Sequence, residues 1–201
     1  NASDACDKLC YQALTDDSVG MDRGDFQIEI TVDKENRTLT VSDNGVGMDK
    51  ADLENNLGVI ASSGSYKFKQ ELGDDAGDTD VIGQFGVGFY SAFMVSDHIT
   101  VVTRKYGAES AYIWQSSGAD GYTVSECEKE TVGTDIVMHI KPDTEDEKYG
   151  EFLESWKLQE LVRKYSDYIR FPIRMEVSKT RKKEDSPEDK PEYETYTEVE
   201  T

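Results

Sequence analysis

Strict alternation of apolar and polar residues is the feature that most constrains how this chain can fold. From Phe26 to Val32 apolar side chains recur at every second position, which is the pattern of a strand with one buried face. The pattern resumes from Arg37 to Ser42 after the polar turn Asp33 to Asn36, so the two segments predict a β-hairpin. Further strands are predicted over residues 98–103, 111–115, 122–126, 134–140 and 171–177.

Helical periodicity accounts for much of the remaining chain. The first residues continue a helical pattern in which Ala5, Leu9 and Leu14 form an apolar stripe. Other helices are predicted over residues 49–57, 86–93, 149–154 and 157–168. Helices combined with hairpins and a run of antiparallel strands predict an α+β two-layer sandwich.

Two stretches show neither period. Residues 58–83 are rich in glycine, serine and aspartate, and a stretch of this length inside a domain indicates either a functional loop or disorder. From Lys179 onward the chain is charged, contains proline and has few aliphatic residues, which is typical of a linker. We therefore expect one domain over residues 1–178 and a charged linker over residues 179–201.

Composition argues against several classes of function. The 201 residues carry a formal net charge of -20, and so acidic a surface repels nucleic-acid phosphates and anionic lipids. No apolar run approaches the length of a membrane span. Cys6, Cys10 and Cys127 are too sparse for a disulfide framework and lack the second pair of a zinc site, which favours reduced thiols in a cytoplasmic protein.

The segment from Asp43 to Met48 ends the second predicted strand with a carboxylate followed by Gly45 and Gly47. A carboxylate at a strand end can accept a hydrogen bond from an amino group on a flat ligand, and glycines let such a ligand approach the backbone. An ordinary turn after a strand explains the same residues equally well. A calcium loop does not, because the acidic residues are not at alternate positions.

The segment from Gly83 to Phe89 places closely spaced glycines before a predicted helix, where backbone N–H groups suit phosphate oxygens. It is neither a P-loop, because no Lys-Ser/Thr pair follows, nor a dinucleotide fingerprint, because no strand precedes it. A flexible hinge is the alternative. On the first helix, Asn1 stands near Asp4 and Ala5, and an asparagine oxygen suits Mg²⁺ beside phosphates, although most helical asparagines are merely solvated.

The order of these segments carries more information than any one of them. Residues 1–5, 43–47 and 83–88, followed by Gly133-Thr134 on a strand, resemble the GHKL ATPase superfamily, which includes heat-shock protein 90 chaperones, gyrase B, MutL and sensor histidine kinases. The runs 1–5 and 82–92 are specifically similar to heat-shock protein 90, and the runs 55–58 and 171–173 agree with that. The likeness covers nearly the whole chain and is nearer to the bacterial branch of that family.

This resemblance implies a Bergerat-type fold that binds ATP or ADP with Mg²⁺, with a mostly antiparallel sheet, helices on one face and a mobile lid over residues 58–83. Asp43 would accept a hydrogen bond from the adenine amino group, Thr134 would complete the polar floor, and Asn1 would hold Mg²⁺ against the phosphates. The resemblance assigns further site residues as apolar walls (Met48, Leu57, Phe89 and Ile136), at the ribose and phosphates (Lys8, Asn56, Gly86, Val87, Gly88 and the N–H of Phe89) and around them (Asp4, Ala5 and Gly47).

Two departures from the family affect the expected activity. A family glutamate four residues before the asparagine positions the attacking water, and nothing precedes Asn1 here, so we expect nucleotide binding with little hydrolysis. We also expect the preceding residues to belong to the parent protein. Relatives carry Lys or Arg at the place of Ser62. The absence of this positive charge should weaken the phosphate contacts or shift them to Lys67.

The resemblance further implies a longer protein that uses a middle-domain arginine, dimerises through a C-terminal domain and couples ATP turnover to the remodelling of client proteins. The isolated domain is expected to be monomeric or weakly associating, without nucleic-acid or membrane partners. The alternative from another class is a sensor-kinase catalytic domain, which needs a phospho-acceptor histidine, but His98 and His139 lie in strand patterns. A DNA-repair or topoisomerase ATPase is a third alternative, and the acidic surface counts mildly against it.

Overall fold

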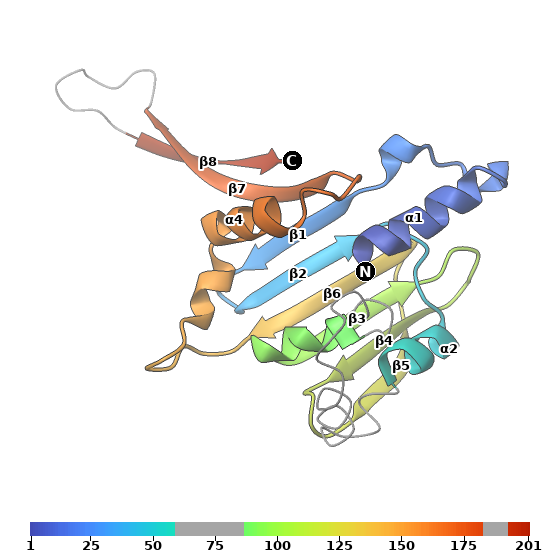
Figure 1. Ribbon diagram of the computed structural model, residues 1–201, viewed down its shortest axis with the longest axis horizontal. Coiled ribbons are helices and arrows are strands. Elements are labelled where there is room, and N and C mark those ends of the chain that lie inside the picture. The colour runs from blue at the N-terminus through green and yellow to red at the C-terminus, as the bar shows by residue number, and fades with distance from the viewer. Residues whose placement is uncertain (59–86, 183–192) are drawn as a thin grey trace, which may run out of the picture.

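The computed structural model describes residues 1–58, 87–182 and 193–201, and its main element is one sheet of eight strands (Figure 1). The strands are β1 (Ile28–Asp33), β2 (Thr38–Asp43), β3 (Ser96–Arg104), β4 (Ala111–Ser116), β5 (Tyr122–Cys127), β6 (Gly133–Ile140), β7 (Ile173–Lys182) and β8 (Tyr193–Glu200). Their order in the sheet is β5-β4-β3-β6-β2-β1-β7-β8. Neighbours pair antiparallel, except that β1 and β7 run parallel.

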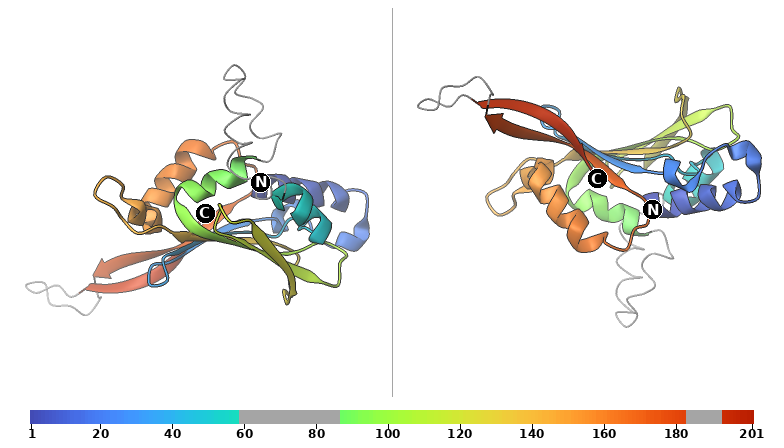
Figure 2. Two further views of the ribbon diagram at one scale, coloured as in Figure 1. Left: turned by 90° about the horizontal axis from the view of Figure 1, so that it is seen from below. Right: turned by 90° about the horizontal axis from the view of Figure 1, so that it is seen from above.

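Helices cover one face of this sheet. The α-helices are α1 (Ala2–Ala13), α2 (Lys50–Leu53) and α4 (Ser155–Tyr165), and η3 (Glu54–Gly58) is a π-helix. The 3₁₀-helices are η1 (Asp17–Val19), η2 (Arg23–Asp25), η4 (Val87–Met94) and η5 (Tyr149–Leu153). Seen along the sheet, α1, α2, η4 and α4 all lie on the same side (Figure 2). The expected α+β two-layer sandwich with a mostly antiparallel sheet is therefore confirmed.

The apolar side chains of the alternating pattern fill the layer between the helices and the sheet. Ile28 and Ile30 of β1 are buried while Glu29 and Thr31 are exposed, as expected for a strand with one covered face. Beneath α1, Cys6 and Leu9 pack with Ile28 in one cluster of buried residues. Two further clusters lie beneath the α4 and η5 helices and beneath the η3 and η4 helices.

Several local predictions differ from the structure. Leu14 is 78% exposed, because α1 ends at Ala13 and the residue falls beyond the apolar stripe. The helix predicted over residues 49–57 is α-helical only in α2 and continues as the π-helix η3. The helix predicted over residues 86–93 is the 3₁₀-helix η4, and residue 86 lies outside the described residues.

The predicted linker is the clearest correction. β7 continues to Lys182, and β8 pairs antiparallel with it from Tyr193 to Glu200, so part of the segment after residue 178 belongs to the sheet. The polar composition of this segment led to the prediction of a linker. A strand pair at the edge of a sheet can have the same composition, because it exposes most side chains and needs few aliphatic ones. The domain boundary at residue 178 stays a prediction. Apart from Gly58, the predicted lid over residues 58–83 lies outside the described residues.

The helices and the cysteines of the described ranges show two further features. No helix there is long and apolar enough to cross a membrane. Cys6, Cys10 and Cys127 are free thiols, as the sparse cysteine pattern predicted. Burial raises the pKa of the Cys6 thiol to about 12, so this side chain acts as a small apolar group in the core.

Candidate functional site

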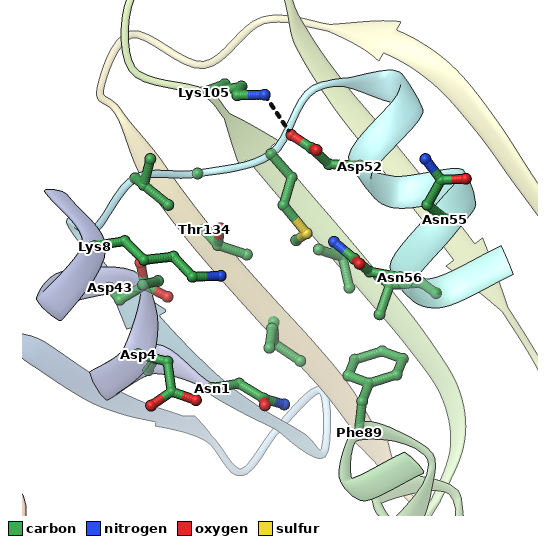
Figure 3. A pocket seen from close by; sticks show the side chains of 18 residues that line it. Asn1, Asp4, Lys8, Asp43, Asp52, Asn55, Asn56, Phe89, Lys105 and Thr134 are labelled. Carbon is green, nitrogen blue, oxygen red and sulfur yellow. Dashed lines mark ion pairs between the residues drawn. The ribbon is translucent and has the colours of Figure 1, made fainter. Parts of the chain in front are cut away.

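A cavity of about 740 Å³ opens on the helical face of the sheet, between α1 on one side and the α2–η3 segment on the other (Figure 3). The ends of β2 and β6 and the neighbouring β3 form its floor. The residues that line it are Asn1, Ala2, Asp4, Ala5, Lys8, Asp43, Val46, Gly47, Met48, Asp52, Asn55, Asn56, Leu57, Phe89, Val101, Lys105, Thr134 and Ile136.

Asp43 is the acidic residue of the cavity floor. It is the last residue of β2, where it pairs with Thr134 of β6, and its exposed fraction is only 9%. Its Oδ1 accepts a hydrogen bond of 2.9 Å from the backbone N–H of Gly45. Burial raises the pKa of the carboxyl from 3.8 to about 6, the Gly45 N–H opposes this, and nearby Asp135 adds to it. At neutral pH the side chain is therefore a buried anion that can only accept hydrogen bonds.

Two threonines extend the polar floor. The hydroxyls of Thr134 and Thr103 lie 3.0 Å apart, and both residues are almost completely buried. Thr103 Oγ1 accepts a hydrogen bond of 2.9 Å from the Met48 N–H, and it donates to the Gly133 carbonyl at 3.2 Å. These bonds hold Thr134 on the floor and tie the segment that follows β2 to the end of β3.

Glycine is required at two positions around this floor. Gly47 has φ +66° and lies so close to β3 that a Cβ would stand 2.0 Å from the Arg104 carbonyl oxygen. Gly133 has φ +121°, and its Cβ would stand 2.0 Å from the Asp43 carbonyl oxygen. Both positions combine a left-handed backbone with contact against backbone atoms that cannot move aside, so a side chain would displace Asp43 or Met48.

The remaining walls of the cavity consist of an apolar part and a polar part. Leu57 and Phe89 are each only 7% exposed, and they pack with Val101 and Trp114 in one buried cluster. Met48 and Ile136 pack against the same cluster and line the cavity.

The polar part lies on α1 and on η3. Asp4 and Lys8 are one helical turn apart on α1, and the close-up shows them beside Asn1 and Asp43, across the cavity from Asn56 (Figure 3). Asn1 precedes α1 without using its side chain to cap the helix, and it lines the cavity. The arrangement suits a ligand with a flat apolar portion that bears a hydrogen-bond donor and with a polar, anionic portion.

The structure brings most of the predicted site residues into this one cavity, including Asn1, Asp43 and Thr134. Most of the glycine-rich segment from Gly83 to Phe89 cannot be compared with the cavity, because residues 83–86 lie outside the described residues. Gly86 lies outside the described residues, as do Ser62 and Lys67. Val87 and Gly88 begin η4, and only the following Phe89 lies on the cavity wall. A Cβ added at Gly88 would meet no atom of the described residues within 4 Å, and the predicted contact of Gly88 with phosphate stays a prediction.

Sequence reasoning missed several residues of the site. Thr103 and Lys105 contact the segment after β2, and Asp52 and Asn55 line the cavity from α2 and η3. A polar Thr103 within an otherwise apolar strand face was the signal for the first of these. The spacing of Asp49 and Asp52, which form a capping box, was the signal for Asp52.

The two histidines lie in the sheet, as their sequence pattern indicated. His98 of β3 is the cross-strand partner of His139 of β6, and His139 Nδ1 lies 2.6 Å from Asp97 Oδ1. Neither histidine lines the cavity within the part of the chain that the structure describes.

Comparisons with known proteins agree with these features. The family model of histidine kinase-, DNA gyrase B-, and HSP90-like ATPases matches residues 22–137, and that of the Hsp90 protein matches residues 151–201. The chain is 54% identical over 201 residues to the chaperone protein HtpG of Clostridium botulinum strain Langeland, covering 100% of this chain and 32% of that relative. It is 55% identical over 193 residues to HtpG of Clostridium acetobutylicum, covering 96% of this chain and 31% of that relative. The chain spans about a third of the length of these curated relatives.

Proposed function

Because the chain belongs to the histidine kinase-, DNA gyrase B- and HSP90-like ATPases, and among them to the heat-shock protein 90 family, we propose that its cavity binds ATP or ADP with the adenine on Asp43. The observation that carries this proposal is a buried carboxylate at the floor of a partly apolar cavity. Such a group accepts a hydrogen bond from the adenine amino group, with Thr134 beside it and Met48, Leu57 and Ile136 against the ring.

The same carboxylate explains discrimination between purines. Guanine presents a carbonyl oxygen where adenine presents the amino group, so its acceptor would face the Asp43 acceptor. A site built around a buried hydrogen-bonding group can reject a ligand that lacks the matching partner by about 10⁴-fold. GTP is therefore expected to bind far more weakly than ATP.

The polar end of the cavity supports the phosphates and Mg²⁺. Mg²⁺ prefers oxygen ligands and takes one or two of them from the protein beside substrate phosphates, which fits the uncapped Asn1 amide with the Asp4 carboxylate near it. The bound metal would neutralise phosphate charge. Lys8 and Asn56 would contact the ribose and phosphates, with the N–H groups of residues 86–89 as a further predicted contact.

The activity of the whole protein is part of this proposal. By similarity to the HtpG chaperones, we infer a molecular chaperone of the heat-shock protein 90 type that acts on client proteins as a dimer in the cytoplasm. ATP hydrolysis by the whole protein would involve the upstream glutamate and the middle-domain arginine of the family.

Calorimetric titration of the 201-residue chain with Mg²⁺-ADP and Mg²⁺-GTP tests the proposal. We expect ADP to bind, GTP to bind at least 100-fold more weakly, and Asp43→Asn to lose most ADP affinity. Asp120→Asn is the matched control, because this aspartate is exposed and does not line the cavity. Equal affinity of the wild type and Asp43→Asn for ADP would overturn the proposed adenine contact.

A further inference from the structure

Lys105 joins the end of β3 to the start of α2. Its ammonium nitrogen lies 2.7 Å from Oδ2 of Asp49 and 2.7 Å from Oδ2 of Asp52. Figure 3 shows this cation and Asp52 at one end of the cavity, with Asn1 at the other end. One cation thus binds two acidic residues that come from a different segment of the chain.

The two carboxylates already have another task. Asp49 is the N-cap of α2 and accepts a hydrogen bond of 2.9 Å from the Asp52 N–H, while Asp52 accepts one of 3.1 Å from the Asp49 N–H. This reciprocal capping box fixes the first turn of α2. It also brings two negative charges together, and their repulsion would oppose the cap without a cation between them. The hydrogen bonds with Lys105 lower the pKa of Asp49, and those with Asp49 and Asp52 raise the pKa of Lys105.

The stretch that contains Lys105 makes further contacts with the segment after β2. Thr103 Oγ1 accepts from the Met48 N–H at 2.9 Å, and the Tyr106 N–H donates to the Val46 carbonyl at 2.8 Å. The capped helix α2 then runs directly into η3, which contributes Asn56 and Leu57 to the cavity wall. The position of that wall therefore depends on where the first turn of α2 is held.

We propose that Lys105 is a positioning residue for nucleotide binding, whose ammonium holds Asp49 and Asp52 and thereby sets the cavity wall formed by Met48, Asn56 and Leu57. This inference rests on the proposed function. Lys105 acts through the two carboxylates and the helix that they cap. By holding them, it keeps the apolar part of the cavity at the width of a flat ring. An isolated exposed ion pair contributes little, but one cation bound to two capping carboxylates forms a network.

The test compares Mg²⁺-ADP with adenosine, which carries no charge. Lys105→Met should lower the affinity for both ligands by the same factor, about fivefold, because a displaced wall affects the adenosine portion that the two ligands share. Lys105→Arg should restore both affinities to within about twofold of wild type, since guanidinium can bind two carboxylates. The control is Lys34→Met, which removes the cation of an exposed pair with Glu154 outside the cavity and should leave both affinities unchanged.

Three outcomes would overturn the proposal. Unchanged affinities in Lys105→Met would show that the contact does not position the wall. Loss of ADP binding with unchanged adenosine binding would indicate direct attraction of phosphate by the cation. An equal loss in Lys34→Met would indicate a general effect of charge.

A second variant keeps the test valid if Lys105→Met does not fold. Asp49→Ser retains a good N-cap and loses one contact with the ammonium, so it should weaken both ligands in the same direction, and unchanged affinities would count against positioning. If wild type binds neither ADP nor adenosine, the proposed function itself fails, and this result is distinguishable from every outcome for the variants.

Discussion

Asp43 is expected to destabilise the folded chain at neutral pH when no ligand is bound. Burial raises the pKa of this carboxyl from 3.8 to about 6. At a pH between these two pKa values, the folded chain therefore holds a proton that the unfolded chain has released. The stability that this group contributes is fully present below about pH 4 and is lost as the pH rises through 6. At pH 7 the loss amounts to about 3 kcal/mol, which is a large part of the stability of a typical domain.

Asp43→Asn removes this penalty with little change in shape. The asparagine side-chain oxygen can still accept the hydrogen bond from the Gly45 N–H, and its amide hydrogens can meet water in the cavity. We therefore expect the variant to be more stable than wild type at pH 7, by roughly 1–3 kcal/mol once imperfect solvation of the amide is allowed for. At pH 4 the two proteins should be about equally stable. The substitution that is expected to remove most of the nucleotide affinity would thus stabilise the empty chain.

Urea denaturation of both proteins between pH 4 and pH 8, without nucleotide, measures this difference. Taking the difference between the two free energies of unfolding at each pH removes the effect of the other titrating groups. Asp33→Asn is a control of opposite sign, because hydrogen bonds from the backbone and side chain of Asn36 lower the pKa of this exposed carboxyl. That variant should be the less stable protein above pH 4. A stability difference for Asp43→Asn that does not change with pH, or that favours wild type at pH 7, would refute the reasoning.

Three further predictions follow from the geometry of the floor. Affinity for Mg²⁺-ADP should be constant above pH 7 and fall below pH 6, because protonation of Asp43 removes the anionic acceptor; titration calorimetry at pH 5.5, 6.5 and 7.5 would detect the fall, and a flat profile would contradict it. Gly47→Ala should lose more than about 2 kcal/mol of unfolding free energy, since its Cβ would strike the Arg104 carbonyl, whereas Gly107→Ala, with a similar positive φ but open space, should lose about 1 kcal/mol. Thr103→Val keeps the shape but leaves buried partners without hydrogen bonds, so chemical denaturation should show a loss of about 1–3 kcal/mol; a neutral result would mean that water replaces the hydroxyl.

Local patterns in the sequence were sufficient to locate most elements and to indicate the family. Strands such as β1 and β6 were predictable because side chains alternate with the period of a sheet, whatever the strand pairs with. The runs 1–5 and 82–92 were distinctive enough to identify the heat-shock protein 90 likeness, which the comparisons confirm together with the GHKL-type fold. The nucleotide contacts of the individual residues stay predictions.

Only the tertiary structure decided how these elements meet. The antiparallel register of β2 and β6 places Thr134 beside Asp43, although ninety residues, from 44 to 133, lie between them in the chain. The contact of Lys105 with the α2 capping box and the placement of β8 on β7 likewise depend on which segments become neighbours. A periodic pattern records the side of an element that is buried, but the partner is chosen by packing and register over the whole sheet, which no local stretch of sequence contains.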